Sequence, residues 1–183
     1  VQYLSQGSIL IGFQHLAVTP ADVVRELVER ETTLIGYELI EDDEGRRPVL
    51  ACQSEIAGRS VINTASDLLQ YEKGGRGIIL GGVAGVAPAT VVILGAGTVG
   101  VSAAKTASAL GAHVIVLDWN PDKLATVMHQ TGNRAVTALA SKRNLERYTQ
   151  IADVLIGAVM IPGGRTPFLV TEEMVPEMKE GSV

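Results

Sequence analysis

The sequence predicts an α/β protein with a doubly wound parallel sheet, and three observations lead to that expectation. From residue 90 onward, short apolar segments alternate with segments of helical periodicity. The apolar segments are rich in valine, isoleucine and leucine and carry few polar residues, as strands buried on both faces do. A glycine-rich turn joins the first of these strands to the first helix. Such alternation is typical of a parallel sheet with helices on its faces.

The composition sets limits on what the protein does. Hydrophobic residues make up 46% of the 183-residue chain and charged residues 19%, which supplies a buried core and excludes an intrinsically disordered chain. The formal net charge of −5 argues against nucleic acid as the main partner. No run of about 18 apolar residues occurs, so we expect no membrane insertion.

The single cysteine, Cys52, excludes an intramolecular disulfide framework and a metal site built from several cysteines. We therefore expect no metal site. We also expect Cys52 to be at least half-buried, and the protein to occupy a reducing, cytoplasmic compartment.

The first 49 residues predict a small α/β unit of their own. An apolar run at 9–13 indicates a strand, and a helix is expected over 20–31. A second strand is expected over 33–40, followed by a charged, solvated turn. We expect this segment to be the end of an α/β domain whose beginning is absent.

Residues 50–183 predict the doubly wound domain. A long helix is expected over 54–73, followed by a glycine-rich connector. The alternating elements are expected to be strands at 90–94, 113–117, 134–137 and 153–158, and helices at 98–110, 121–130, 144–152 and 171–179. A fifth strand is expected to begin near residue 182.

Glycine is concentrated in one region, because nine of the 20 glycines lie within residues 74–100. The turn Gly95-Ala-Gly-Thr-Val-Gly100 has the GxGxxG pattern, follows an expected strand and opens an expected helix. Gly95 allows a tight turn, Gly97 lets a pyrophosphate approach the backbone, and Gly100 permits close contact between helix and strand. The turn therefore predicts a dinucleotide site.

The cofactor expected at this turn is NAD. Thr98 and Val99 open the helix, where free N–H groups and the helix dipole favour phosphate. Asp118 ends the next strand, 23 residues after Gly95, and its carboxylate would accept hydrogen bonds from ribose hydroxyls while repelling the 2′-phosphate of NADP. Lys123 is placed to reach the ribose or a phosphate, and a surface lysine is the alternative. A glycine-rich turn that binds no nucleotide is the alternative for the whole motif.

Residues 74–100 closely resemble the signature of the alanine dehydrogenase and pyridine nucleotide transhydrogenase family. Three further motifs extend the resemblance over essentially the whole chain: Phe13-Gln-His-Leu-Ala17, Ser54-Glu-Ile-Ala-Gly-Arg59 and Gly157-Ala-Val-Met-Ile-Pro-Gly163. The segment at 117–124 and the short path from it to Asp153 are similar to the alanine dehydrogenase branch.

The resemblance implies roles for individual residues. His15 stands at the position of the family's catalytic histidine, and a structural histidine at a strand end is the alternative. Ser54 corresponds to a residue near the cofactor phosphates or the nicotinamide, and helix N-capping would also explain it. Ala158 and Val159 follow the fourth strand and by analogy lie over the cofactor ribose.

The implied activity is the NAD-dependent conversion of L-alanine to pyruvate and ammonium by a homo-oligomer, hexameric by resemblance. The family's substrate-binding arginine and lysine lie upstream of the matching segment, and a further catalytic aspartate lies downstream. We therefore expect residues 1–49 to be the end of the substrate domain and residues 50–183 to be a Rossmann NAD-binding domain cut before its fifth strand. Such a fragment is expected to be inactive alone.

Three other interpretations stay open at this stage. The chain is also consistent with the NAD(H)-binding subunit of a proton-translocating transhydrogenase, with a non-catalytic NAD-binding module, and with a purely structural α/β unit. A histidine at the end of a strand argues against a pure sensor. Calorimetric titration with NAD separates the structural interpretation from the others.

Overall fold

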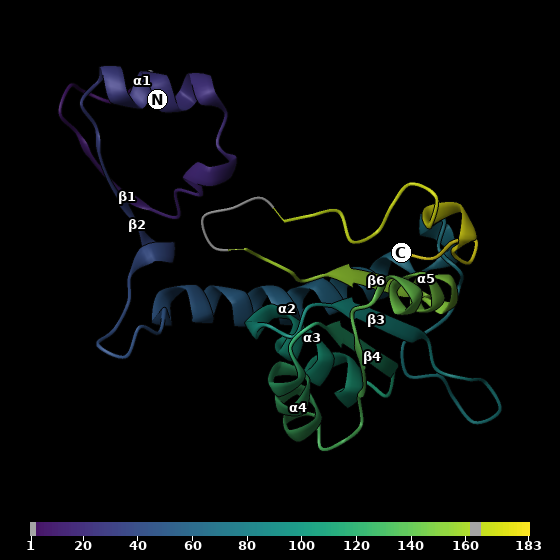
Figure 1. Cartoon of the computed structure of the whole chain (residues 1–183). Coiled ribbons are helices and arrows are strands. Elements are labelled where there is room, and N and C mark those ends of the chain that lie inside the picture. Colours follow the sequence, from purple (N-terminus) through teal and green to yellow (C-terminus); the bar gives the residue numbers. More distant parts are fainter. Residues whose placement is uncertain (1–2, 162–165) are drawn as a thin grey trace. The chain divides into compact units, whose positions relative to one another are not determined.

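The computed structural model describes residues 3–161 and 166–183 of the chain (Figure 1). The chain divides into two compact units. Unit 1 comprises residues 1–53 with 161–166, and unit 2 comprises residues 54–160 with 167–183.

Unit 1 contains a two-stranded parallel sheet connected through a helix. Strand β1 (Ile9–Gly12) pairs in register with β2 (Thr33–Gly36), and the connection contains the short 3-10 helix η1 (Leu16–Val18) and helix α1 (Ala21–Glu29). In α1, Leu27 is buried. The α/β character predicted for this segment is confirmed.

Strand β2 is shorter than the sequence indicates. It ends at Gly36, and a 3-10 helix, η2 (Tyr37–Leu39), replaces the second half of the strand expected over 33–40. The cause is a contact distant in sequence, because the Glu38 carboxylate accepts hydrogen bonds from backbone N–H groups at the end of β1. Local β-propensity gives no sign of such a contact.

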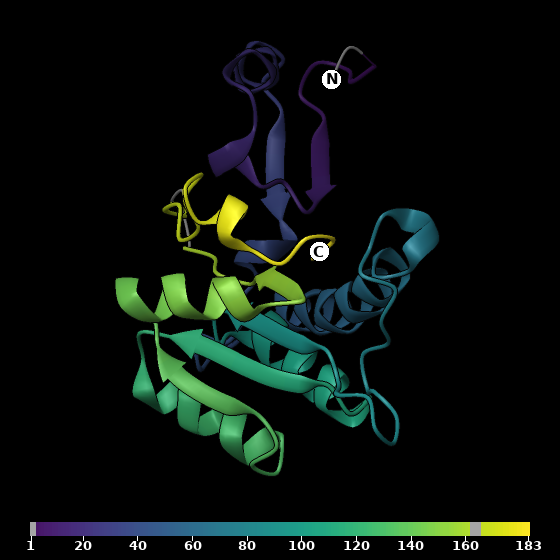
Figure 2. The same ribbon diagram turned by 90° about the vertical axis from the view of Figure 1, so that its right-hand side faces the viewer.

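The sheet of unit 2 has four parallel strands in the order β5-β4-β3-β6. The strands are β3 (Thr90–Leu94), β4 (His113–Asp118), β5 (Val136–Leu139) and β6 (Val154–Gly157). The connecting helices are α3 (Thr98–Ala109), α4 (Pro121–Gln130) and α5 (Lys142–Ile151). Figure 2 shows α4 and α5 on opposite faces of this sheet, so the doubly wound fold is confirmed.

Each face of the sheet has its own core, which explains why the strands are apolar throughout. Alternate strand residues such as Val91 and Val116 pack with buried alanines of α3 and with Val127 of α4. Their neighbours, such as Val92, pack with Leu145 of α5. Successive side chains of a strand point to opposite faces of the sheet, so one strand contributes to both cores. Apolar residues are therefore expected at every position of a strand that is covered on both faces.

Helix α2 (Pro48–Leu68) begins six residues before the expected start. Proline suits the first helical position because its fixed φ matches the helix and its missing N–H would be unpaired there. Ser54 therefore lies within the second turn of α2, and its interpretation as a helix N-cap is wrong. Beyond α2, the 3-10 helix η3 (Tyr71–Lys73) ends at Gly74, whose φ is 83°.

Helix α2 contacts α3 through a glycine. A Cβ on Gly58 would overlap the carbonyl oxygen of Val99 and lie 2.6 Å from Ser102 Cβ. The Ser102 hydroxyl donates a 2.8 Å hydrogen bond to the carbonyl of Glu55. Gly58 therefore allows the backbones of α2 and α3 to approach closely near the start of α3.

The helix expected over 171–179 is wrong. The segment forms turns and the 3-10 helix η4 (Val175–Glu177). Pro176 explains the failure, because it has no N–H to donate and disfavours α conformation in the residue before it. Val183 then pairs with β6, since its N–H donates to Asp153 and its carbonyl accepts from Leu155.

Asp153 joins four segments of unit 2 at the start of β6. Its buried carboxylate accepts a 2.7 Å hydrogen bond from the Thr90 N–H, at the start of β3. The same group pairs with Lys179 Nζ at 2.9 Å and with Arg76 Nε at 3.0 Å. Arg76 also donates to the carbonyl of Glu180, so this cluster joins the connector and the C-terminal segment to the sheet.

Across residues 3–161 and 166–183, no helix is both long and apolar enough to cross a membrane. Within those same ranges, histidine, cysteine and carboxylate side chains do not gather in threes as a metal site requires. Cys52 is exposed, so the expectation that it is at least half-buried is wrong.

Candidate functional site

The order of the strands places the topological switch point of the sheet between β3 and β6. Chain order runs outward from β3 to β5 on one side, whereas β6 adds to the other side of β3. In open α/β sheets, ligands bind beyond the carboxyl ends of the strands at such a reversal. The loops after β3 and β6 meet there, because the Ala158 N–H donates a 2.7 Å hydrogen bond to the Leu94 carbonyl.

The turn after β3 requires two of its glycines for steric reasons. Gly95 has φ 108°, and a Cβ on it would lie 2.6 Å from the Ala158 carbonyl oxygen. A Cβ on Gly100 would overlap the carbonyl oxygen of Gly95. These contacts agree with the predicted purposes of both residues, the tight turn and the close contact between helix and strand.

Gly97 differs from Gly95 and Gly100 because none of the described residues fills the space beside it. It is the N-cap of α3, and a Cβ built on it would meet no heavy atom of residues 3–161 or 166–183 within 4 Å, its chain neighbours aside. The N–H groups of Thr98 and Val99 follow at the start of the 12-residue helix, where backbone donors have no partner within the helix. This open backbone and the positive helix end form a cradle that suits a phosphate.

Asp118 lies beside this cradle with a fixed carboxylate. The residue ends β4 and is 8% exposed. Its Oδ2 accepts a 2.7 Å hydrogen bond from the Ala96 N–H within the glycine turn, and its Oδ1 accepts a 2.9 Å bond from the Asn120 N–H. A carboxylate oxygen can accept two hydrogen bonds, so each oxygen of Asp118 keeps capacity for a ligand hydroxyl.

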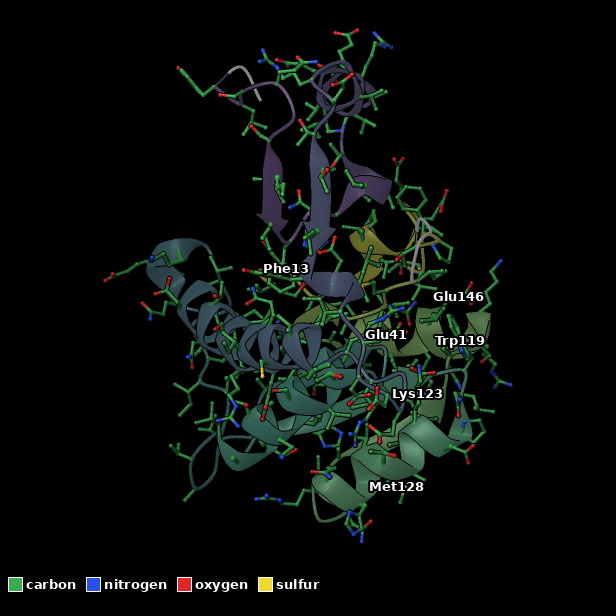
Figure 3. All side chains as sticks on the ribbon, turned by 90° about the vertical axis from the view of Figure 1, so that its left-hand side faces the viewer. Phe13, Glu41, Trp119, Lys123, Met128 and Glu146 are labelled. Carbon is green, nitrogen blue, oxygen red and sulfur yellow. The ribbon has the colours of Figure 1, made fainter. Side chains whose placement is uncertain are left out.

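Lys123 reaches the same region from α4. Asn120 caps that helix by accepting hydrogen bonds from the N–H groups of Asp122 and Lys123. The Lys123 side chain lines a cavity of about 430 Å³ together with Gly97 and Thr98. Trp119, which Figure 3 labels together with Lys123, follows Asp118 in the chain. Its side chain is 58% exposed.

The loop after β6 lies on the other side of the switch point. Val159 lies against the glycine turn, since its Cγ2 is 2.9 Å from the position a Cβ on Gly95 would take. Ala158 and Val159 therefore adjoin the turn, and their place over the cofactor ribose stays a prediction. Pro162 and Gly163 of the predicted loop motif lie outside the described residues.

In unit 1, His15 follows β1 and has an unusual backbone. Its φ of 47° and ψ of 39° are left-handed, and it is the N-cap of η1. Its ring stacks on Phe13 with 5.9 Å between centroids, and Tyr37 meets Phe13 edge-on at 5.6 Å. The side chain is exposed, so its imidazole is accessible to a ligand.

Glu38 is a residue that sequence reasoning missed. Its Oε1 accepts a 2.7 Å hydrogen bond from the His15 N–H and a 3.1 Å bond from the Gln14 N–H. Partial burial favours a higher pKa for the Glu38 carboxyl, but backbone N–H donors at Glu38, His15 and Gln14, and the His15 ring, hold that pKa below its ordinary value. No local motif signals this contact, because 23 residues separate Glu38 from His15.

Comparisons with known sequences agree with the resemblance. The family model for the alanine dehydrogenase/PNT C-terminal domain matches residues 60–183. An alanine dehydrogenase of Methanococcus maripaludis is 41% identical over all of this chain and 48% of its own length. An alanine dehydrogenase of Bilophila wadsworthia is 45% identical over 97% of this chain and 47% of its own. The chain thus spans about half the length of these curated relatives.

Solved structures give the same result. An L-alanine dehydrogenase structure superposes with a TM-score of 0.85 and 38% identity, over 98% of this chain and 49% of that one. A transhydrogenase structure from Sinorhizobium meliloti superposes with a TM-score of 0.71 and 26% identity, over 97% of this chain and 52% of that one. Because the family model matches residues 60–183 and these relatives are more than 40% identical, the chain belongs to the alanine dehydrogenase/PNT family.

Proposed function

We propose that unit 2 binds NAD and that the protein is an NAD-dependent alanine dehydrogenase, with L-alanine and pyruvate as its substrates. One observation carries the cofactor assignment. The Asp118 carboxylate is hydrogen-bonded to the Ala96 N–H inside the glycine turn, so a ribose acceptor lies directly beside a phosphate cradle. Family membership supports the substrate assignment.

Different residues of unit 2 would bind different parts of the dinucleotide. The N–H groups of Thr98 and Val99, beside the open backbone of Gly97, would hold the pyrophosphate. Asp118 accepts from the ribose hydroxyls, and its charge repels the 2′-phosphate of NADP. Lys123 adds a positive charge beside the same cavity. Ala158 and Val159 would lie over the ribose, and we propose that Ser54 of α2 lies near the phosphates or the nicotinamide.

His15 is proposed as the catalytic residue. The reaction takes L-alanine, water and NAD⁺ to pyruvate, ammonium, NADH and one proton, and bound NAD⁺ would supply the hydride acceptor. The His15 imidazole would hydrogen-bond the oxygen or nitrogen on the reacting carbon and move protons during hydride transfer. Its exposed ring at the end of a strand is suited to that role.

Replacing Asp118 with asparagine is expected to weaken NAD binding about tenfold or more, because a charge-assisted acceptor for two ribose hydroxyls is lost. Trp119 is the only tryptophan and adjoins the site, so quenching of its fluorescence reports binding directly. Circular dichroism of each variant checks that the domain is folded.

Asp122→Asn is the matched control, because Asp122 is exposed and lies four residues further along the chain. It is expected to bind NAD like the wild type. Equal NAD affinity in wild type and Asp118→Asn would remove Asp118 from the site. Absence of any fluorescence or calorimetric response to millimolar NAD in the wild type would overturn the cofactor assignment.

We further propose a homo-oligomer, hexameric as the family resemblance implies, in the cytoplasm. The exposed face of α1 supports an assembly surface, since Val28 is 71% exposed there. Light scattering coupled to size exclusion is expected to give a mass several times the 19.3 kDa of one chain. A mass of one chain at micromolar concentration would contradict this proposal.

A further inference from the structure

The backbone at the end of β1 is held in a conformation that its residues do not favour. His15 has φ 47° and ψ 39° although it carries a Cβ. Left-handed backbone is unfavourable for such residues and persists only where surrounding contacts enforce it. Something in unit 1 must therefore stabilise this turn.

The contacts that enforce it come from Glu38. Because β1 and β2 are parallel and in register, their carboxyl ends lie side by side at Gly12 and Gly36. The Glu38 carboxylate turns back over this edge and accepts from the N–H groups of Gln14 and His15. Glycine at position 36 leaves the room, since a Cβ there would lie 3.1 Å from Glu38 Oε2.

Aromatic contacts then fix the direction of the imidazole. The His15 ring lies nearly parallel to Phe13, with an interplanar angle of 13°, and Tyr37 lies at 88° to Phe13. Tyr37 precedes Glu38 in η2, so the same short 3-10 helix supplies the carboxylate and supports the ring stack. Backbone and ring of His15 are thus held from one element.

We infer that Glu38 is the positioning residue for His15, holding the left-handed backbone that directs the imidazole outward. It acts through the His15 backbone and needs no contact with substrate. The inference rests on the proposed function, which gives His15 its catalytic role. The depressed pKa of the Glu38 carboxyl agrees with this role, since the ionised form accepts from both N–H groups.

The test is NMR of the 183-residue chain with Glu38→Ala and Glu38→Gln. In Glu38→Ala, the amides of Gln14 and His15 are expected to exchange with solvent about tenfold faster or more, because two charge-assisted hydrogen bonds are lost. The Cα and Cβ chemical shifts of His15 are expected to move away from values typical of left-handed backbone. Its ring protons are expected to lose the upfield shift caused by the ring current of Phe13. Glu38→Gln keeps one oxygen acceptor and is expected to retain part of each signal.

Glu41→Gln is the matched control, because Glu41 is paired with Arg47 and lies three residues after Glu38. It is expected to leave the His15 signals unchanged. If Glu38→Ala loses the dispersed resonances of β1 and β2, Glu38→Gln decides the matter on its own. Wild-type His15 shifts and exchange rates in Glu38→Gln, or in a folded Glu38→Ala, would overturn the inference.

These signals report the geometry of His15 and involve neither NAD nor turnover. NAD titration of the same variants, followed by Trp119 fluorescence in unit 2, is expected to match the wild type. If the wild type does not bind NAD while the His15 signals are as expected, the proposed function is contradicted and the inference on Glu38 is not. The two failures are therefore distinguishable.

Discussion

Replacing Gly100 with alanine is expected to destabilise unit 2 by about 2–3 kcal/mol and to abolish NAD binding, because overpacking at a rigid contact forces the backbone apart. The new methyl group would overlap the Gly95 carbonyl oxygen and lie 3.5 Å from Ile93 Cγ2. Gly95 cannot yield easily, since the Ala158 carbonyl occupies its other side. Urea denaturation followed by Trp119 fluorescence measures the loss.

Gly97→Ala is the matched variant, because it adds the same methyl group three residues earlier in open space. Its free energy of unfolding is expected to stay within about 0.5 kcal/mol of the wild type, as for a substitution that disturbs no contact. NAD binding is nevertheless expected to weaken tenfold or more, by at least about 1.4 kcal/mol, because the methyl group fills the place of a phosphate. Wild-type NAD affinity in Gly97→Ala would show that the pyrophosphate does not pass over this residue.

The second large effect is expected for Asp153→Ala, which should cost on the order of 3 kcal/mol, because it removes one partner of a buried ionic cluster. The carboxylate is 6% exposed and meets Arg76 and Lys179. The substitution also leaves the Thr90 N–H without its 2.7 Å acceptor at the start of β3. Urea denaturation measures this change, with circular dichroism as a second signal.

Asp67→Ala serves as the control, because Asp67 forms a 3.0 Å ion pair with Lys73 on the surface, where both side chains are about half exposed. An exposed pair of this kind is worth less than about 1 kcal/mol. Equal losses for Asp67→Ala and Asp153→Ala would mean that burial of the Asp153 cluster contributes nothing to stability.

The fold of unit 2 was predictable because local and long-range preferences coincide there. Strands β3 and β4 are apolar at every position that faces either core, and the glycine turn sits where its backbone conformation demands glycine. Asp118 is recognisable from its sequence position, 23 residues after Gly95, because one helix and one strand fill that interval. In such regions the pattern of residues is sufficient to predict the local structure.

Other features depend on partners far along the chain, which no local pattern reveals. Strand β2 ends early because Glu38 binds the end of β1, and Gly58 is needed because α3 approaches α2. The start of α2 at Pro48 was hidden by the charged turn before it. Pro176 did carry a local signal against the expected helix over 171–179, and the acidic residues preceding it gave a misleading cap pattern.

The two backbone N–H groups that hold Asp118 have a consequence for the energetics of ligand capture. A free aspartate side chain loses rotational freedom when it binds a hydroxyl, and that loss opposes binding. Here the loss is already met during folding, since Ala96 and Asn120 fix both carboxylate oxygens. The domain therefore presents a preorganised acceptor, and a larger share of the interaction with a ribose appears as affinity.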